Sequence, residues 1–201
     1  AKGRSLMDVG CGYGMLLAEA ITRDFTVEGI EPDQTLVELA KHRHPSLRIH
    51  HSTMEEFVIR EQFDTVISID TLECVADPVP LLQGIVKLVK PGGRLILVVP
   101  HEPLLYGSRD RMMGYFQRFS RRPMKAALSG LGLNIHLCRT WNALLWPAYL
   151  LLYKILNQKS HYAQLRSQQA PSRVARFISR GLDSWFKHIE NRWSFGFGLS
   201  L

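Results

Sequence analysis

Residues 6–14 read Leu-Met-Asp-Val-Gly-Cys-Gly-Tyr-Gly. An apolar run that ends in an acid leads into a turn with three glycines, and a helix-like apolar pattern follows from Met15 to Ile21. This order is typical of a strand, a tight loop and a helix. Because glycine has no Cβ, the loop backbone can turn sharply and approach a ligand closely. The stretch therefore predicts a small-molecule site at the carboxyl end of the first strand of an open α/β sheet.

The first hundred residues continue this alternation of strands and helices. Near-continuous apolar runs, as in residues 63–69 and 95–99, are typical of central strands that are covered on both faces. The pattern as a whole predicts βαβ units and a mostly parallel sheet. We expect strands at 4–9, 25–30, 47–50, 63–69 and 94–99, and helices at 13–23, 34–43 and 78–89.

Charge is distributed unevenly along the chain. Residues 1–108 hold 10 Lys/Arg and 15 Asp/Glu, whereas residues 109–201 hold 15 Lys/Arg and 3 Asp/Glu. A basic half indicates either an anionic partner or a solvated basic face, and the sequence leaves both open. The three cysteines are widely separated, with neither metal-ligand spacing nor a disulfide framework, so we expect a reducing, cytoplasmic environment.

The acids around the glycine loop narrow the choice of ligand. A dinucleotide loop reads G-x-G-x-x-G, but here the order is G-x-G-x-G and Met15 stands where the third glycine belongs. Asp8, just before the loop, suits a cationic group rather than a pyrophosphate. Glu31 ends the second expected strand, where a carboxylate accepts hydrogen bonds from ribose hydroxyls. A ligand with an ammonium, a ribose and no phosphate is S-adenosylmethionine.

Four stretches in register make the chain resemble the class I S-adenosylmethionine-dependent methyltransferases. They are residues 7–14, 29–33, 63–78 and 88–100. The resemblance implies that S-adenosylmethionine is the cofactor and S-adenosylhomocysteine the product, and it implies no metal ion. It assigns cofactor binding to Asp8, Gly10, Cys11, Gly12, Tyr13, Gly14, Glu31, Pro32, Ser52, Thr53, Met54, Ser68, Ile69 and Asp70.

Two histidines that many members of this family carry are missing here. Where they read Leu-Glu-His this chain has Leu-Glu-Cys at residues 72–74, and residues 114–120 also lack a histidine. Metal-assisted O-methylation is thereby disfavoured. His101 is the best remaining candidate for a catalytic base, and Tyr115 is a second catalytic candidate on the acceptor side. Because the cofactor already carries an activated methyl group, positioning of the acceptor matters more than any universal catalytic residue.

The second half of the chain completes the expected fold. We expect a helix at 120–130, a strand within 131–140 and a last strand at 195–201. The resemblance then implies a Rossmann-like, seven-stranded, mostly parallel sheet whose last strand is antiparallel. Residues 1–142 and 193–201 would form the methyltransferase domain, and residues 143–192 a helical cap inserted in it.

The expected reaction is methyl transfer to a small-molecule or lipid-linked acceptor, with oxygen as the favoured atom. Residues 143–156 are strongly apolar but too short to span a bilayer, and residues 172–190 predict a basic amphipathic helix. Residues 143–190 therefore either face an anionic membrane surface or pack on the sheet as a lid. No nucleic-acid-binding module is recognisable. The alternative functions are a non-catalytic S-adenosylmethionine-binding protein and an NAD-dependent oxidoreductase.

Overall fold

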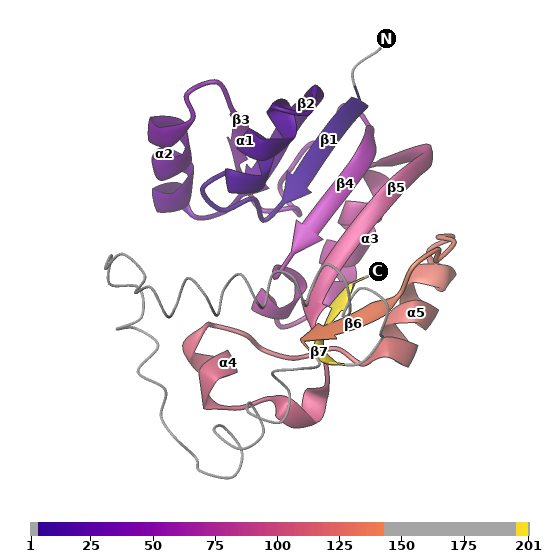
Figure 1. Ribbon diagram of the computed structural model, residues 1–201. Coiled ribbons are helices and arrows are strands. Elements are labelled where there is room, and N and C mark those ends of the chain that lie inside the picture. The colour runs from indigo at the N-terminus through magenta and orange to yellow at the C-terminus, as the bar shows by residue number, and fades with distance from the viewer. Residues whose placement is uncertain (1–3, 143–195, 201) are drawn as a thin grey trace, which may run out of the picture.

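The computed structural model of the protein describes residues 4–142 and 196–200. One sheet crosses the described part, with the strand order β3-β2-β1-β4-β5-β7-β6 (Figure 1). The strands are β1 (Arg4–Val9), β2 (Phe25–Glu31), β3 (Arg48–His51), β4 (Phe63–Ile69), β5 (Val89–Pro100), β6 (Arg139–Asn142) and β7 (Gly196–Ser200).

The first five strands pair in parallel, so their carboxyl ends lie at the same edge of the sheet. β7 pairs antiparallel with β5 on one side and with β6 on the other. The order of strands changes direction at β1, which lies between β2 and β4, and ligands of open α/β sheets bind outside such a point. The expectation of an α/β, Rossmann-like fold built on a parallel sheet is confirmed.

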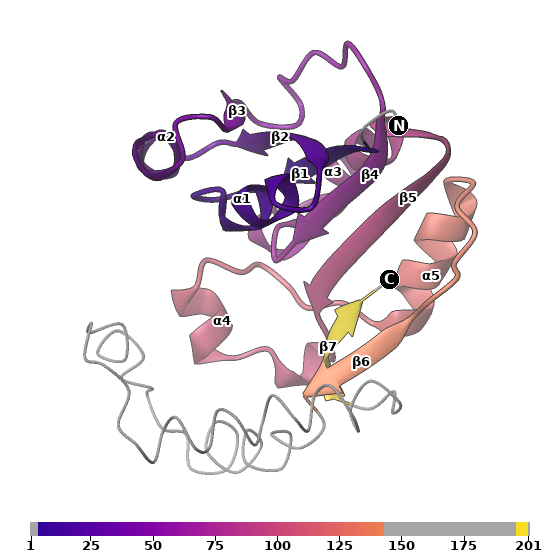
Figure 2. The same ribbon diagram turned by 45° about the horizontal axis from the view of Figure 1, so that its top comes forward.

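Helices cover both faces of the sheet (Figures 1 and 2). One apolar cluster holds Leu17 and Val37 from the helices α1 and α2, and the other holds Ile85 and Leu128 from α3 and α5. Burial on both faces explains why the central strands read as apolar runs. The helices are α1 (Met15–Ile21), α2 (Gln34–Arg43), α3 (Pro78–Lys87), α4 (Ser108–Met112) and α5 (Arg121–Gly130), with 3-10 turns η1 (Leu72–Cys74) and η2 (Pro103–Leu105).

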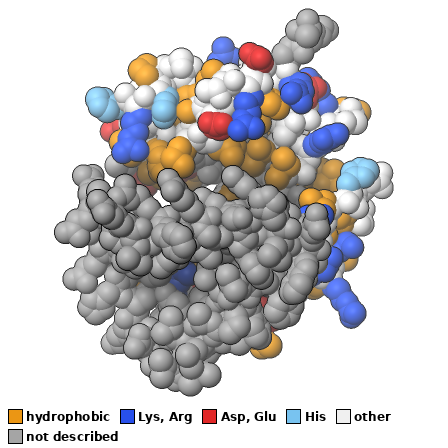
Figure 3. All heavy atoms as spheres, viewed as in Figure 1, with side chains coloured by type: hydrophobic (Ala, Val, Ile, Leu, Met, Phe, Trp, Pro, Cys, Tyr) orange, Lys and Arg blue, Asp and Glu red, His pale blue; other side chains and the backbone are white. Residues whose placement is uncertain are grey.

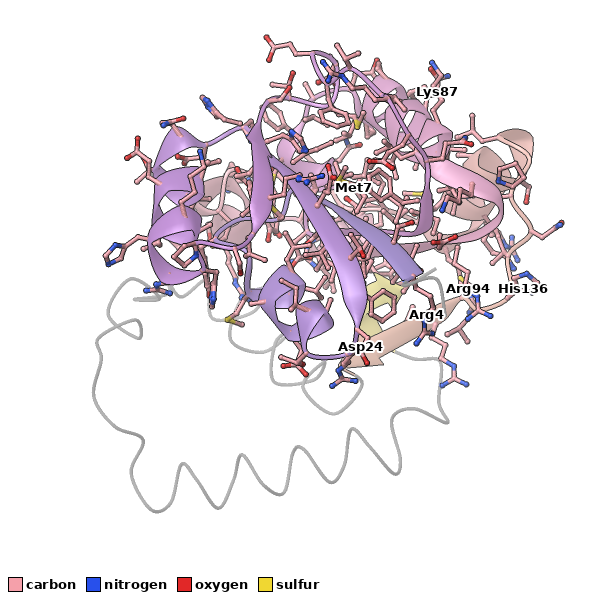
Figure 4. The ribbon with its side chains drawn as sticks, turned by 90° about the horizontal axis from the view of Figure 1, so that it is seen from above. Arg4, Met7, Asp24, Lys87, Arg94 and His136 are labelled. Carbon is pink, nitrogen blue, oxygen red and sulfur yellow. The ribbon has the colours of Figure 1, made fainter. Side chains whose placement is uncertain are left out.

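The amino ends of the strands form the opposite end of the domain from the expected site. Figure 4 looks down on this end and shows Met7 in the middle, with the charged side chains of Arg4, Lys87 and Arg94 around it. Met7 is fully buried and packs in the cluster on the α3 side. The core thus runs the length of β1 and fixes the strand that leads into the glycine loop.

Two strands, β5 and β6, differ most from the sequence expectation. β5 begins at Val89 rather than at Arg94, because Val89 pairs with Phe63 before the pairing shifts to Arg94 with Thr65. The chain between these pairs bulges at Gly92, which has a φ of 75°. β6 is confined to Arg139–Asn142, since the segment before it turns at Gly132, which has a φ of 84°.

The structure also contains α4 within residues 101–119, a range in which we expected neither a helix nor a strand. The helical cap expected over residues 143–192, and with it the membrane-facing surface expected over 143–190, lies outside the described residues. Among the residues that are described, no helix is both long and apolar enough to cross a bilayer.

Candidate cofactor site

The glycine loop is tied to the end of β2 by backbone hydrogen bonds. The amides of Gly10 and Cys11 donate to the carbonyl oxygen of Ile30, at 2.9 and 3.1 Å. The amide of Gly12 donates to Oε2 of Glu31, at 2.8 Å. The loop and the acid that the sequence singled out, 19 residues apart, are therefore one structural unit at the carboxyl edge of the sheet.

Glycine is required at position 10 by the geometry. Gly10 has a φ of 80°, and a Cβ built there would lie 2.3 Å from Oγ1 of Thr71. That hydroxyl donates to the carbonyl oxygen of Val9, at 3.1 Å, and so holds the segment after β4 against the loop. The close approach of two strand ends at this point needs a residue without a side chain.

Asp8 and Glu31 are two buried acids that lie close enough to interact. Their exposed fractions are 5% and 6%. Burial, and then the charge of Glu31, raises the pKa of Asp8 to about 7. No described residue donates a hydrogen bond to the Asp8 carboxylate, whereas Glu31 accepts from the amides of Gly12 and Asp33. An uncompensated buried carboxylate at this place favours a ligand that brings a positive charge.

The residues after β3 divide between the rim of the site and the core. The amide of Ser52 donates to the carbonyl oxygen of Glu31, at 3.2 Å, which keeps Ser52 and Thr53 beside the end of β2. Met54 is buried in the α3-side core, where its Cγ lies 2.7 Å from the place a Cβ of Gly84 would take. Ser52 and Thr53 thus lie beside Glu31 at the end of β2, while Met54 packs in the core.

The other loop and strand-end residues have structural contacts of their own. Cys11 is buried against Gly29, the guanidinium of Arg43 lies over the ring of Tyr13, and the carbonyl of Pro32 bonds to the ring of His51. Burial raises the pKa of the Cys11 thiol to about 12, so this thiol is not a nucleophile.

The end of β4 presents one inward and two outward residues. Ser68 is fully buried, and its hydroxyl has no partner in the described part of the chain. Ile69 is exposed, and Asp70 follows it in the left-handed region with a φ of 51°. Ile69 and Asp70 are thus the members of this predicted set that lie at the surface beside the loop.

The two catalytic candidates have different surroundings. The ring Nδ1 of His101 bonds to the carbonyl oxygen of Phe119, at 2.9 Å. Burial, and then the charges of Asp70 and Glu73, raises the pKa of Tyr115 well above its usual value. Tyr115 therefore lies among the acids that follow β4, whereas one nitrogen of His101 is used in holding its own segment.

A buried ion pair that the sequence did not reveal organises residues 101–119. Nη2 of Arg118 lies 2.8 Å from Oδ1 of Asp110, with exposed side-chain fractions of 5% and 2%. Arg118 also donates to the carbonyl oxygen of His101, and Asp110 accepts from the amide of Gly107. These bonds fix the segment that carries both catalytic candidates.

Removing one partner of this ion pair should destabilise the domain strongly. We expect Asp110→Ala to lower the free energy of unfolding by about 3 kcal/mol, because it leaves Arg118 buried without its counter-charge. The control Glu19→Ala breaks the exposed pair with Arg23 and should cost less than about 1 kcal/mol. Urea denaturation measures both, and equal losses in the two variants would contradict the assigned role.

A cavity of the described part lies at the β3 edge and reaches the site only at Ser52. It measures about 590 Å³ and is lined by Glu28, Arg48 and His50 among others. Glu28 already pairs with Arg48 and with His50, each at 2.7 Å. Within residues 4–142 and 196–200, no three histidine, cysteine or acidic side chains are arranged to hold a metal ion.

Known proteins resemble the part of the chain that builds this site. The family model for a methyltransferase domain matches residues 7–95. A ubiquinone biosynthesis O-methyltransferase of Coxiella burnetii is 29% identical over 99 residues, which cover 47% of this chain and 42% of that protein. The protein of the same name from Dinoroseobacter shibae is 38% identical over 101 residues, or 47% and 40% of the two chains. The match thus spans less than half the length of these relatives.

Solved structures support the fold over a longer part of the chain. A TehB-like SAM-dependent methyltransferase from Corynebacterium glutamicum superposes with a TM-score of 0.54 at 20% identity, covering 69% of this chain and 70% of its own. The Bacillus subtilis protein YcgJ superposes with a TM-score of 0.60 at 16% identity, covering 88% and 81%. At these identities the likeness concerns the fold alone.

Proposed function

We propose that the chain is a class I S-adenosylmethionine-dependent methyltransferase, a proposal supported by the methyltransferase-domain model that matches residues 7–95. The methyl group goes from S-adenosylmethionine to an oxygen of a small-molecule or lipid-linked acceptor, and S-adenosylhomocysteine is the product. The observation that carries the proposal is Asp8, a buried acid without a hydrogen-bond donor, next to Glu31 and the glycine loop.

The residues present suit each part of the cofactor. Asp8 supplies the negative charge for the methionine ammonium, and its burial makes that charge effective. Glu31 holds the ribose hydroxyls through lone pairs that the amides of Gly12 and Asp33 leave unused. Ser52 and Thr53 lie where an adenine ring would follow the ribose. When bound, the cofactor supplies a sulfonium-activated methyl group, so the protein's task is to place the acceptor in line with it.

The segment after β5 forms the acceptor side. Its anchor is the buried Arg118–Asp110 pair, and it leaves several large apolar side chains exposed. On the face in Figure 3, hydrophobic side chains gather in a band across the middle of the molecule. An apolar entrance suits an acceptor with an apolar body or a lipid tail. The exposed apolar side chains of this segment are Leu104, Met112, Met113 and Phe116.

The finer organisation of the second half belongs to the same proposal. We propose that residues 143–192, which follow β6 in the chain and precede β7, form a helical cap on the acceptor side of the seven-stranded sheet. The basic character of residues 109–201, with 15 Lys/Arg against 3 Asp/Glu, supports contact of this cap with an anionic membrane surface. A lipid-linked acceptor would then reach the site from that surface.

Turnover separates this function from a non-catalytic role. Purified protein is incubated with S-adenosylmethionine and paired acceptors that differ only in carrying a hydroxyl or an amine, such as a phenol and the matching aniline. We expect S-adenosylhomocysteine, measured by mass spectrometry, to form with hydroxyl acceptors, and Asp8→Ala to abolish it. The control Asp24→Ala removes an exposed acid and should leave the rate unchanged. Tight cofactor binding without turnover on any acceptor would favour the non-catalytic alternative.

A further inference from the structure

Glu73 is an acid buried without a counter-charge bonded to it. Its residue is fully buried in η1, and no N–H or hydroxyl group of the described residues donates to either carboxylate oxygen. The side chain that bonds to this carboxyl is another acid, Asp70. Its backbone is fixed, because the carbonyl oxygen of Glu73 accepts from the amide of Phe116, at 2.7 Å. An ionised carboxylate in such a place is costly, so the side chain is held in its protonated form.

Asp70 lies three residues earlier and at the surface. Its left-handed backbone is held by a hydrogen bond from its amide to the carbonyl oxygen of Val98, at 3.0 Å. The neighbouring Thr71 bonds to the carbonyl oxygen of Val9 and so places Asp70 beside the glycine loop. Partial burial of its carboxyl raises the pKa of Asp70, although the hydrogen bond with Glu73 lowers it, and burial followed by the charge of Asp70 raises the pKa of Glu73 to about 8.

The groups around this pair do not offer another proton acceptor. Burial and the two acids raise the pKa of the Cys74 thiol to about 11, so it stays a thiol. The pKa of Tyr115 is raised as well, so its phenol keeps its proton and remains a hydrogen-bond donor. The cations that act on the cluster are Arg118, which lowers the pKa of Glu73, and Arg109, which lowers that of Tyr115.

We propose that Asp70 and Glu73 form a proton-sharing carboxyl pair, and that Asp70, its surface member, accepts the proton of the acceptor hydroxyl. This inference rests on the proposed methyl transfer. The acceptor O–H bond breaks and its proton passes to the Asp70 carboxylate. The acceptor oxygen forms its bond to the methyl carbon, and the electron pair of the broken C–S bond stays on sulfur. Asp70 is thus a catalytic residue, and Glu73 is a positioning residue that acts through it.

The pairing explains how the chain does without the histidine that many family members carry at position 74. A carboxylate that shares a proton with a buried acid is desolvated and fixed in direction, which suits a general base. The bond from the Thr71 hydroxyl to the carbonyl oxygen of Val9 also holds Asp70 beside the loop at residues 10–14, to which the proposed function assigns the cofactor.

A titration of the ligand-free protein tests whether Asp70 and Glu73 share a proton, and it needs neither a methyl acceptor nor the cofactor. In protein labelled with ¹³C at the glutamate carboxyl carbons, we expect one resonance to titrate near pH 8 and to be absent from Glu73→Gln. In Asp70→Asn the resonance should titrate at lower pH, since the charge of Asp70 is gone. Glu19→Gln, which removes an exposed glutamate, should leave it unchanged. Titration of every glutamate below about pH 5, the range of unperturbed carboxyls, would overturn the pair.

Kinetics test the role of Asp70 as base. With a hydroxyl acceptor that supports turnover, Asp70→Asn should lower kcat about 100-fold, within the range of general-base effects, and change the KM for S-adenosylmethionine far less. Glu73→Gln should flatten the pH profile of kcat near pH 8. An Asp70→Asn enzyme with unchanged kcat would overturn the base role and leave methyl transfer standing. Failure of the wild type to bind S-adenosylmethionine would instead overturn the proposed function, whatever the titration shows.

Discussion

Asp8→Ala is expected to weaken the binding of S-adenosylhomocysteine about 100-fold at pH 8, because a desolvated ion pair that loses one partner costs about 3 kcal/mol. The product is the ligand of choice since it retains the ammonium and the ribose but cannot react. The control Asp24→Ala removes an exposed acid on the far side of α1 and should leave the affinity unchanged. Calorimetric titration measures both constants, and an Asp8→Ala affinity within about threefold of the wild type would contradict the role of Asp8.

The same residue makes binding depend on pH. Burial and Glu31 raise the pKa of Asp8 to about 7 in the ligand-free protein, and the ammonium binds the ionised carboxylate. Affinity should therefore rise roughly tenfold between pH 6 and pH 8, and Asp8→Asn should remove this dependence. The folding stability of the ligand-free protein depends on pH in the opposite direction from the affinity for the cofactor. The folded state holds the Asp8 proton more tightly than the unfolded state, so stability falls as pH rises through 7, and Asp8→Asn should raise the Tm at pH 8.

Gly10→Ala is expected both to remove cofactor binding and to destabilise the domain. The new methyl group would lie 2.3 Å from Oγ1 and 2.7 Å from Cγ2 of Thr71, and the φ of 80° is strained for alanine. The backbone strain alone costs about 1–2 kcal/mol, and the clash adds to it. Thermal unfolding and titration with S-adenosylhomocysteine measure the two losses.

The control for this substitution is Gly92→Ala. Gly92 has nearly the same backbone angle, a φ of 75°, but a Cβ there would have nothing within 4 Å. Gly92→Ala should thus show only the strain and retain cofactor binding. In the double variant Gly10→Ala/Thr71→Ala, part of the lost stability should return, because the threonine atoms that the new Cβ meets are removed. Equal effects of the two glycine variants would show that the contact with Thr71 is unimportant.

The site residues that could be predicted from the sequence are those that lie at the end of a strand or directly after it. Asp8, Glu31 and Asp70 each end or follow a strand whose apolar run is legible in the sequence, and parallel strands bring their carboxyl ends to one edge. The alternation of elements likewise predicted the parallel sheet, with β1, α2 and β4 matching their expected bounds. These features depend on local patterns, which a single sequence contains.

The features that were missed depend on packing between distant segments. The resemblance groups Met54 with Ser52 and Thr53 as cofactor-binding residues, which stays a prediction, whereas the packing of Met54 on Gly84 of α3 is visible only in the structure. Glu73 reads as an ordinary polar residue of a turn, and only the tertiary structure encloses it. The Arg118–Asp110 pair lies within a segment of mixed polar and apolar residues that has no clear period. Pairing and burial of this kind have no signature in residue spacing.

The central claim is that Asp8, Glu31 and the loop between them bind a cationic ribonucleoside rather than a dinucleotide. Calorimetric titration of the wild-type protein with S-adenosylhomocysteine and, separately, with NAD tests it most directly. We predict saturable one-to-one binding of S-adenosylhomocysteine that strengthens from pH 6 to pH 8, and no heat of binding with NAD. Binding of NAD, or absence of S-adenosylhomocysteine binding at either pH, would contradict the claim.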